Sequence, residues 1–278
     1  MEASLVTLEE HVTCSAIDPT SRLLATSSSA AVSTFAQADD CSWARTGVWL
    51  APSPVQSLAW APPAFGALLA VAHVGGVSLL RLCAGGLAQV AALGGGWEAT
   101  ALAFAPLEHG LLLAVACSDG AVRLHGEAEG LWAERSSLEL SSHVPATALA
   151  WAPAGADRPP TLAVGTASGA GVWQYQAALR RWARLVALEV SPNVLRFSPA
   201  AGRPHLLLAA AEQASVLLWK LDMPAAGLAA ASLQHTWSLE APVGSLGFDF
   251  LGTSLAAAAG GTIHRWTANL FGTWEALQ

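Results

Sequence analysis

Residues 58–72 carry the stretch that decides the fold, LAWAPPAFGALLAVA. It consists of a short apolar run that ends in Pro62, a loop that contains Pro63 and Gly66, and a second apolar run that contains the pair Leu69-Ala70. Proline cannot donate a hydrogen bond to a continuing β-ladder, so Pro62 ends the first run in a turn. Both runs have the length of a β-strand rather than of a helix. The stretch therefore predicts two short strands joined by a tight loop.

The same unit recurs six times along the chain, which is the strongest signal in the sequence. The alanine of the Leu-Ala pair stands at positions 25, 70, 114, 163, 209 and 256, so successive pairs are 45, 44, 49, 46 and 47 residues apart. In five units an apolar run ending in proline precedes the pair, and residues 246–252 replace that proline in the sixth unit. A third apolar run follows each pair. The fourth segment of most units contains a tryptophan, at Trp43, Trp132, Trp182, Trp237 and Trp274.

Four short strands in a unit of about 45 residues are typical of one blade of a β-propeller. We therefore predict an all-β fold, a six-bladed β-propeller that forms a single domain over residues 1–278. The predicted blades span residues 11–51, 54–93, 99–140, 146–190, 193–240 and 243–278. One blade cannot bury both faces of its sheet, so neighbouring blades must stack to form the core. Large aromatic residues in the first strands are suited to fill the space between blades, as Trp60 and Trp151 would.

The composition excludes several classes of protein. Hydrophobic residues make up 53% of the chain and charged residues 12%, against about 25% charged in an ordinary soluble domain, which argues against intrinsic disorder. The 13 Lys and Arg against 20 Asp and Glu give a net charge of −7, so we expect no direct binding of nucleic acid. The apolar runs are of strand length and are broken by proline and glycine, so we expect no transmembrane segment.

No motif points to catalysis. Gly94-Gly95-Gly96 lacks the spacing and the following helix of a phosphate-binding loop, and the four cysteines form no CxxC pair. The eight histidines are scattered without ligand spacing. We therefore predict no catalytic residue, no cofactor and no metal site, with a propeller enzyme that uses an axial site as the alternative. Trp49 and Trp97 lie in the segments that lead from one blade to the next, where they either anchor a partner or, as we prefer, pack beneath the blades.

The repeat resembles that of WD-repeat propellers. The third unit keeps a Ser118-Asp119-Gly120 turn, but no Trp-Asp dipeptide is present, so we expect most of the usual structural aspartate network to be absent. Within the WD-repeat family, residues 60–66 and 104–123 look like the Sec-thirteen group. Residues 200–209 and 266–274 are more similar to its Seh-type nucleoporin branch. The resemblance covers essentially the whole chain.

The resemblance implies a six-bladed propeller that fails to close and takes a seventh blade from an α-solenoid scaffold nucleoporin. It implies a non-catalytic scaffold of the Y-shaped outer-ring subcomplex of the nuclear pore complex, at the nuclear envelope, with other Y-complex nucleoporins as further partners. Such a scaffold supports pore assembly and the transport of protein and mRNA. It also implies a second setting in a nutrient-sensing complex of the TOR kinase pathway, at the vacuolar or lysosomal surface. The alternative is a Sec-thirteen-type protein shared between the COPII vesicle coat and the pore.

The residues themselves give some support for an open ring. The last unit ends in its own fourth segment, and the only spare segment is residues 3–8. Unpaired strand edges invite added strands. We therefore predict a partner-binding site between the first and sixth blades, at Leu5, Val6, Leu8, Val243 and Leu246. In the alternative arrangement, residues 3–8 complete a terminal blade and close the ring.

Overall fold

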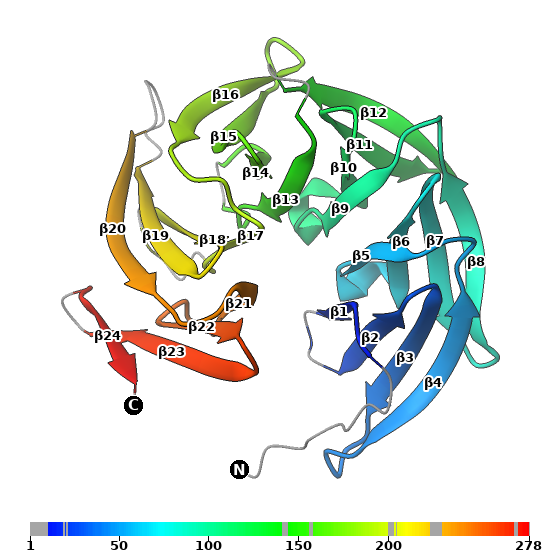
Figure 1. Cartoon of the computed structure of the whole chain (residues 1–278). Coiled ribbons are helices and arrows are strands. Elements are labelled where there is room, and N and C mark those ends of the chain that lie inside the picture. The colour runs from blue at the N-terminus through cyan, green and yellow to red at the C-terminus, as the bar shows by residue number, and fades with distance from the viewer. Residues whose placement is uncertain are drawn as a thin grey trace. The chain divides into compact units, whose positions relative to one another are not determined.

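The computed structural model describes residues 11–18, 20, 22–140, 144–155, 158–199, 203, 205–222, 230–269 and 272–277. By its internal contacts the chain divides into two compact units, residues 1–143 (unit 1) and residues 144–278 (unit 2). Each unit contains three four-stranded antiparallel sheets whose strands follow one another in chain order (Figure 1). Each sheet is therefore a meander, the topology of a propeller blade.

Unit 1 holds blades 1 to 3. Their strands are β1 (Cys14–Ile17), β2 (Leu23–Ser28), β3 (Ala31–Gln37) and β4 (Trp43–Leu50) in blade 1, β5 (Val55–Trp60), β6 (Leu68–His73), β7 (Gly76–Cys83) and β8 (Gly86–Leu93) in blade 2, and β9 (Ala99–Phe104), β10 (Leu112–Cys117), β11 (Ala121–Ala128) and β12 (Leu131–Glu139) in blade 3. Single 3-10 turns follow the first strand in blades 2 and 3, η1 (Pro63–Phe65) and η2 (Leu107–His109).

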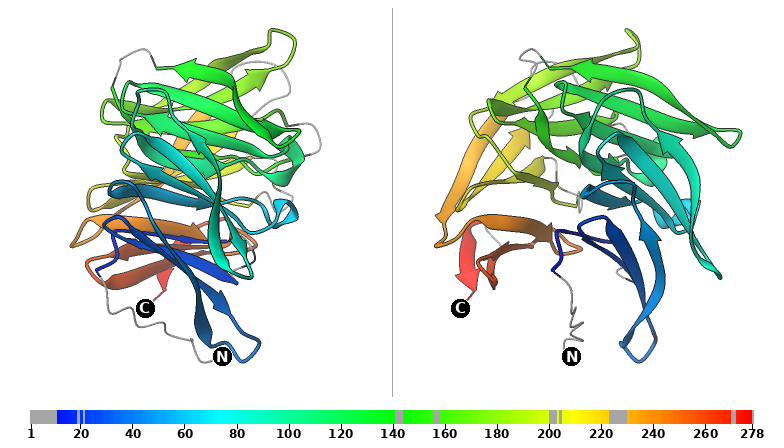
Figure 2. Two further views of the ribbon diagram at one scale, coloured as in Figure 1. Left: turned by 90° about the vertical axis from the view of Figure 1, so that its right-hand side faces the viewer. Right: turned by 45° about the vertical axis from the view of Figure 1, so that its right-hand side comes forward.

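Unit 2 holds blades 4 to 6. Their strands are β13 (Ala146–Trp151), β14 (Thr161–Thr166), β15 (Gly169–Gln176) and β16 (Arg181–Leu188) in blade 4, β17 (Val194–Phe197), β18 (Leu206–Glu212), β19 (Ser215–Asp222) and β20 (Ala230–Ser238) in blade 5, and β21 (Val243–Phe248), β22 (Ser254–Ala259), β23 (Thr262–Ala268) and β24 (Trp274–Leu277) in blade 6. The turned views show that the sheets of each unit are twisted (Figure 2).

The six sheets confirm the predicted all-β fold of six propeller blades. Within each unit the first strands of successive blades lie next to one another, β1 beside β5 and β5 beside β9, then β13 beside β17 and β17 beside β21. Each sheet falls inside one of the predicted blade ranges. The single-domain boundary over residues 1–278 stays a prediction.

The core of each unit lies between the stacked sheets. All six residues of β6 and of β14 are buried, and so are six of the seven residues of β18. These second strands consist mainly of Ala, Leu and Val, so both of their faces can approach a neighbouring sheet closely. One cluster joins blades 2 and 3 around Leu79 and Leu113, and another joins blades 4 and 5 around Leu195 and Leu208.

Polar contacts between the first strands add to this stacking. At least one such hydrogen bond, in or just before the first strands, joins each pair of successive blades within a unit. The donors and acceptors are Trp60 Nε1 and Ala16 O (3.2 Å), Leu102 N and Ser57 Oγ (3.3 Å), Thr147 Oγ1 and Pro192 O (2.9 Å), and Asn193 Nδ2 and Val243 O (2.7 Å). Trp60 thus fills the space between blades, as predicted, and also makes a directional contact to the preceding blade.

In the sixth unit Phe250 stands where the other units have the proline after the first strand, and the residue before it, Asp249, closes the loop. Asp249 Oδ1 accepts hydrogen bonds from the backbone N–H groups of Thr253 (2.6 Å) and Ser254 (2.8 Å). Asp18 closes the corresponding loop of blade 1 in the same way. A carboxylate that satisfies the backbone donors of the loop stabilises this turn without proline.

The close approach of strands β7 and β8 in blade 2 requires a glycine at position 76. Gly76 has a φ of +140°, and a Cβ at this position would lie 2.1 Å from Leu93 O. We expect Gly76→Ala to lower the free energy of unfolding by about 2 kcal/mol or more, because the backbone must move and adopt a strained conformation.

Gly85 provides the matched control, because a Cβ there meets nothing within 4 Å and its φ is not positive. Gly85→Ala should change stability by less than about 1 kcal/mol. Urea unfolding of both variants measures the difference. Equal effects would contradict the close approach described at Gly76.

Candidate partner-binding faces

The sheet of blade 6 has one face that packs on blade 5 and one face that does not. Successive side chains of a strand point to opposite faces, so the strand register assigns each residue to a face. Leu246, Leu255 and Trp266 pack against blade 5. We call the opposite side the free face of blade 6. It consists of Ser245, Gly247, Ser254, Ala256, Ala258, Ile263, Arg265, Thr267, Glu275 and Leu277.

Burial along β22 shows the difference between the two faces. Its residues alternate between buried and half-buried, with Leu255, Ala257 and Ala259 buried on the blade 5 side. By contrast, β18 in blade 5 is buried on both sides. On the free face Ile263 is 72% exposed and Leu277 is also exposed. The sheet of blade 6 therefore offers a surface of the kind that other blades bury.

The chemistry of the free face suits packing by another sheet. Small side chains lie at its centre and on β21, where Ala256 and Ala258 are flanked by Ser245 and Gly247. Small side chains project only a little from the sheet, so a second sheet with larger residues can pack closely against it. Arg265 of β23 is the direct cross-strand neighbour of Ala256, and Glu275 of β24 is paired with Thr267. The residues of β21 and β22 on this face are therefore uncharged, and charged side chains begin at β23.

Blade 1 also has a face directed away from its neighbour in unit 1. Cys14, Ala16 and Leu23 lie against the cluster shared with blade 2. The opposite face, which we call the free face of blade 1, carries apolar side chains at its rim. Its members include Ile17, Leu24, Phe35, Val48 and Leu50. Ile17, Val48 and Leu50 are exposed, whereas Thr26 and Ser33 at the centre of the same face are buried. Adjacent exposed apolar residues are typical of an interaction site.

Of the five predicted site residues, two lie in the described part of the chain and three do not. Leu5, Val6 and Leu8 lie outside the described residues. Val243 and Leu246 are 1% and 5% exposed and belong to the cluster between blades 5 and 6. Their side chains therefore support blade 6 from within, while Ser245 and Gly247 of the same strand β21 lie on the free face. Sequence reasoning chose the apolar residues of this strand, and it could not tell which face each residue occupies.

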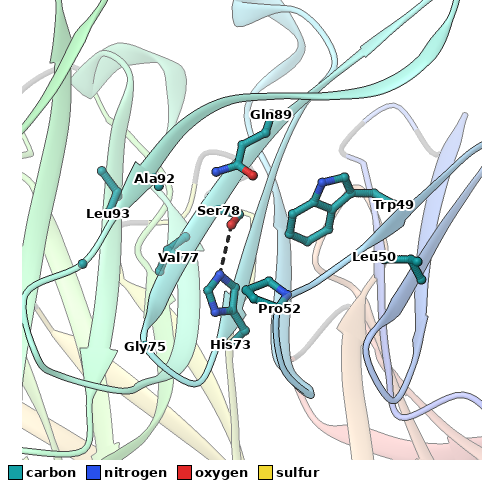
Figure 3. A pocket seen from close by; sticks show the side chains of 11 residues that line it. Trp49, Leu50, Pro52, His73, Gly75, Val77, Ser78, Gln89, Ala92 and Leu93 are labelled. Atoms are coloured by element: carbon teal, nitrogen blue, oxygen red, sulfur yellow. Dashed lines mark hydrogen bonds between the residues drawn. The ribbon is translucent and has the colours of Figure 1, made fainter.

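Trp49 and Trp97 have different surroundings. Trp97 is buried between blades 2 and 3, as preferred from the sequence. Trp49 is in strand β4 rather than between blades and lines a cavity of about 430 Å³ with Pro52, His73 and Gln89 (Figure 3). Both ring nitrogens of His73 lie 3.0 Å from a hydrogen-bond partner in its own blade. The cavity therefore presents an indole ring and a proline rather than a reactive group.

The cavity exists because blade 2 has a small residue where blade 3 has a large one. Ser78 pairs with Val71 as Arg123 pairs with Val115, so the two residues occupy equivalent positions. The Arg123 guanidinium lies 5.3 Å from the centre of the Trp97 ring and makes two hydrogen bonds to Asp119. Sequence reasoning missed the cavity. Aligning the third strands of the six units could have found it.

The titratable groups beside Arg123 are structural rather than catalytic. Hydrogen bonds from Arg123 hold the pKa of the Asp119 carboxyl below its usual range. Burial raises the pKa of the Cys117 thiol to about 11, so Cys117 is not an activated nucleophile. His125 is 6% exposed, and burial lowers its pKa. Its Nε2 atom has no hydrogen-bond partner among the described residues.

A metal site and a membrane-spanning helix are two further features to consider in the described residues. Among the described residues, no group of three or more His, Cys, Asp or Glu side chains could hold a metal ion. No helix in the described ranges is long and apolar enough to cross a membrane.

Comparison with known proteins identifies the repeat. The WD40 family, described as "WD domain, G-beta repeat", matches residues 2–33. Protein transport protein SEC13 of Mycosarcoma maydis is 28% identical over 291 residues, covering 81% of this chain and 79% of the relative. Nucleoporin SEH1-B of Xenopus laevis is 24% identical, covering 92% of this chain and 81% of the relative. The crystal structure of a protein from Lactobacillus plantarum matches 99% of this chain and 86% of that chain, with a TM-score of 0.76 at 16% identity, which shows the fold alone.

The six meander sheets make this chain a six-bladed propeller, and residues 2–33 match a WD repeat. Over most of its length it is similar to SEC13 and SEH1 proteins, one named for protein transport and the other a nucleoporin. These findings confirm the resemblance to the Sec-thirteen group and its Seh-type branch.

The buried His125 makes stability depend on pH. Because the pKa of His125 is lowered in the folded state, protons bind the unfolded chain more tightly. Its contribution is therefore complete above the unfolded pKa of about 6.5 and is lost as the pH falls through the folded value. We expect His125→Leu, which places the residue found at the equivalent Leu80, to reduce the loss of stability on acidification.

The measurement is the urea midpoint at about pH 7.5 and about pH 5. The exposed His11 serves as control, and His11→Gln should keep the full dependence on pH. An unchanged dependence in His125→Leu would contradict the assignment. Burial also lowers the pKa of His109 and of His205, so part of the acid sensitivity should persist in that variant.

Proposed function

We propose that this protein is a non-catalytic scaffold propeller of the nuclear pore Y subcomplex, where it holds an α-solenoid nucleoporin by accepting strands from it. The observation that carries the proposal is the free face of blade 6, which has small side chains on β21 and β22, as an inter-blade surface does, and the exposed residue Ile263. Similarity to SEH1 nucleoporins over 92% of the chain supports the setting. Localisation at the nuclear envelope and a role in pore assembly and transport follow from that setting.

The mode of binding follows from how the blades bind one another. Blades 2 and 5 each bury both sides of their second strand between the two other blades of their unit. Partner strands that form one more sheet would cover the free face of blade 6, the free face of blade 1, or both. Main-chain ladders within the added sheet would give affinity, and pockets for alternate side chains would give specificity. The contribution predicted for Leu5, Val6 and Leu8 remains part of this proposal, and the alternative in which residues 3–8 close the ring predicts no added strands.

A second candidate is a component of a vesicle coat, because SEC13 of Mycosarcoma maydis is 28% identical to this chain. A third setting, the nutrient-sensing complex of the TOR pathway, uses the same kind of partner-completed propeller. The candidates differ in the protein that binds and not in how it binds. Purification of the tagged full chain at moderate salt, with identification of its stoichiometric partner, separates them. We expect a pore scaffold protein; outer-coat proteins alone would favour the second candidate.

An enzyme remains the alternative from another class. The described groups with shifted pKa values belong to structural clusters, as at Asp119 and Cys117. No nucleophile, base and orienting group stand together among the described residues. A small molecule that stabilises the chain in a thermal-shift screen and is turned over by it would favour the enzyme.

The role of the free face of blade 6 can be tested with a single exposed residue. We expect Ile263→Glu to lower recovery of the partner about 10-fold or more, because the carboxylate would have to be buried against apolar surface. Leu131, which is 74% exposed at the start of β12, matches the 72% exposure of Ile263 and belongs to neither free face. Leu131→Glu should leave recovery unchanged.

The readout is the ratio of partner to tagged chain after purification, with the urea midpoint of each variant as the check on folding. If Ile263→Glu keeps its partner, the partner does not bind at this face. If deleting the strands donated by the recovered partner leaves the complex intact, strand addition itself is contradicted.

A further inference from the structure

A cluster of positive charge lies on the outer strand of blade 4. Residues 180–184 read RRWAR, so three of the 13 Lys and Arg of the chain fall within five residues. Strand β16 carries Arg181 and Arg184 and no acidic residue, and Arg180 immediately precedes it. The other outer strands differ, because β8 and β20 carry no Asp, Glu, Lys or Arg, β12 and β24 carry more acidic than basic residues, and β4 carries the single arginine Arg45.

The three arginines are not used within the fold. Arg180, Arg181 and Arg184 are all exposed. The ion pairs between described residues lie in blades 1, 3 and 5, and none of them involves these arginines. In a protein with a net charge of −7, a group of three unpaired cations is therefore available to an external anion.

The strand that carries these arginines is held firmly. Trp182 lies between Arg181 and Arg184, and its ring packs edge-on against Trp151 at 5.9 Å and against Tyr175 at 5.6 Å between ring centres. These contacts fix β16 to the rest of the blade 4 sheet. Arg181 and Arg184 therefore project from a preorganised strand rather than from a loop, which lowers the entropic cost of binding.

The main chain of β16 also has an open side. The strand order in the sheet is β13-β14-β15-β16, so only one edge of β16 is paired within the sheet, and Figure 1 shows β16 as the outermost strand of blade 4. Arg181 is paired with Gln176 and Arg184 with Trp173, which places the two arginines on opposite faces of the sheet. A strand added at this edge would have a cation above it and a cation below it.

We propose that the free edge of β16 binds an acidic segment of a partner protein as an added β-strand. The open edge supplies main-chain donors and acceptors, and the arginines select carboxylates on both faces of the incoming strand. A peptide fits better than a nucleic acid for two reasons. A phosphate backbone has no N–H donors and so cannot form a main-chain ladder with β16, and the protein as a whole is negatively charged. This site is in blade 4 and is independent of the free faces of blades 1 and 6.

The test uses the full chain and a short fluorescent peptide in which glutamates stand three positions apart among valines and threonines, so that carboxylates lie on both faces of a strand. Fluorescence anisotropy measures its binding at low and at physiological salt. One comparison peptide has glutamine in place of every glutamate. Two others carry N-methyl groups on alternate amides, one on the odd-numbered and the other on the even-numbered residues, so that each blocks the hydrogen bonds of one edge of the strand. A single-stranded RNA oligonucleotide is the competing probe.

The matched control is Arg135, an exposed arginine on the outer strand β12 of blade 3. We expect the double variant Arg181→Glu/Arg184→Glu to weaken binding of the glutamate peptide about 10-fold or more at low salt, with a smaller loss for the corresponding glutamine variant. Arg135→Glu should stay within about 2-fold of the unaltered chain. The glutamine peptide and both N-methylated peptides should bind much more weakly.

Three results would overturn the proposal. One is that the unaltered chain does not bind the glutamate peptide. Another is that the N-methylated peptides bind as tightly as the parent, which would mean charge attraction without strand addition. The third is that the RNA binds more tightly than the peptide and is lost in the Arg181 and Arg184 variants. The isolated chain is used throughout, so none of these results depends on the nuclear pore partner.

Discussion

Face-to-face packing of sheets is the constraint on which this structure depends. A four-stranded blade with an Ala-, Leu- and Val-rich second strand cannot exist with both faces in water, because each face is apolar. Strands β6 and β18 meet this requirement by lying between the two other blades of their own unit. In β22 of blade 6 the requirement is met on one side, and its other face is half-buried. The proposed function is a direct consequence of that difference.

Much of the fold could be predicted from the sequence, because the residues that recur in each unit are the ones that the packing of the blades requires. The recurring Leu-Ala pair marks the buried second strand, and Trp60 marks the contact between blades. Residues 246–252 lack the proline of the other units, yet Asp249 closes the same loop by accepting backbone hydrogen bonds. The loop after the first strand can therefore form with or without the proline, and the sixth blade could be recognised only from the repeat as a whole.

The candidate site was harder to predict, for a physical reason. A strand buried on both sides shows no alternation of apolar and polar residues, so hydrophobicity does not tell which face a residue occupies. Val243 and Leu246 were the natural choice for a binding surface, but they face blade 5, and Ser245 and Gly247 on either side of Leu246 lie on the free face. The arginines of β16 were visible in the sequence, but their lack of ion pairs and the open edge beside them appear only in the structure.

The central claim is that a partner covers the free faces of the terminal blades. Carbene footprinting of exposed side chains, read by mass spectrometry on the chain alone and on its purified complex, tests this directly. The account predicts that labelling falls at Ile263 and Leu277 on blade 6, at Ile17 and Leu50 on blade 1, or at both pairs, while Leu131 and Leu233 keep their labelling. Unchanged labelling at both free faces, with protection confined to blades 2 to 5, would contradict it.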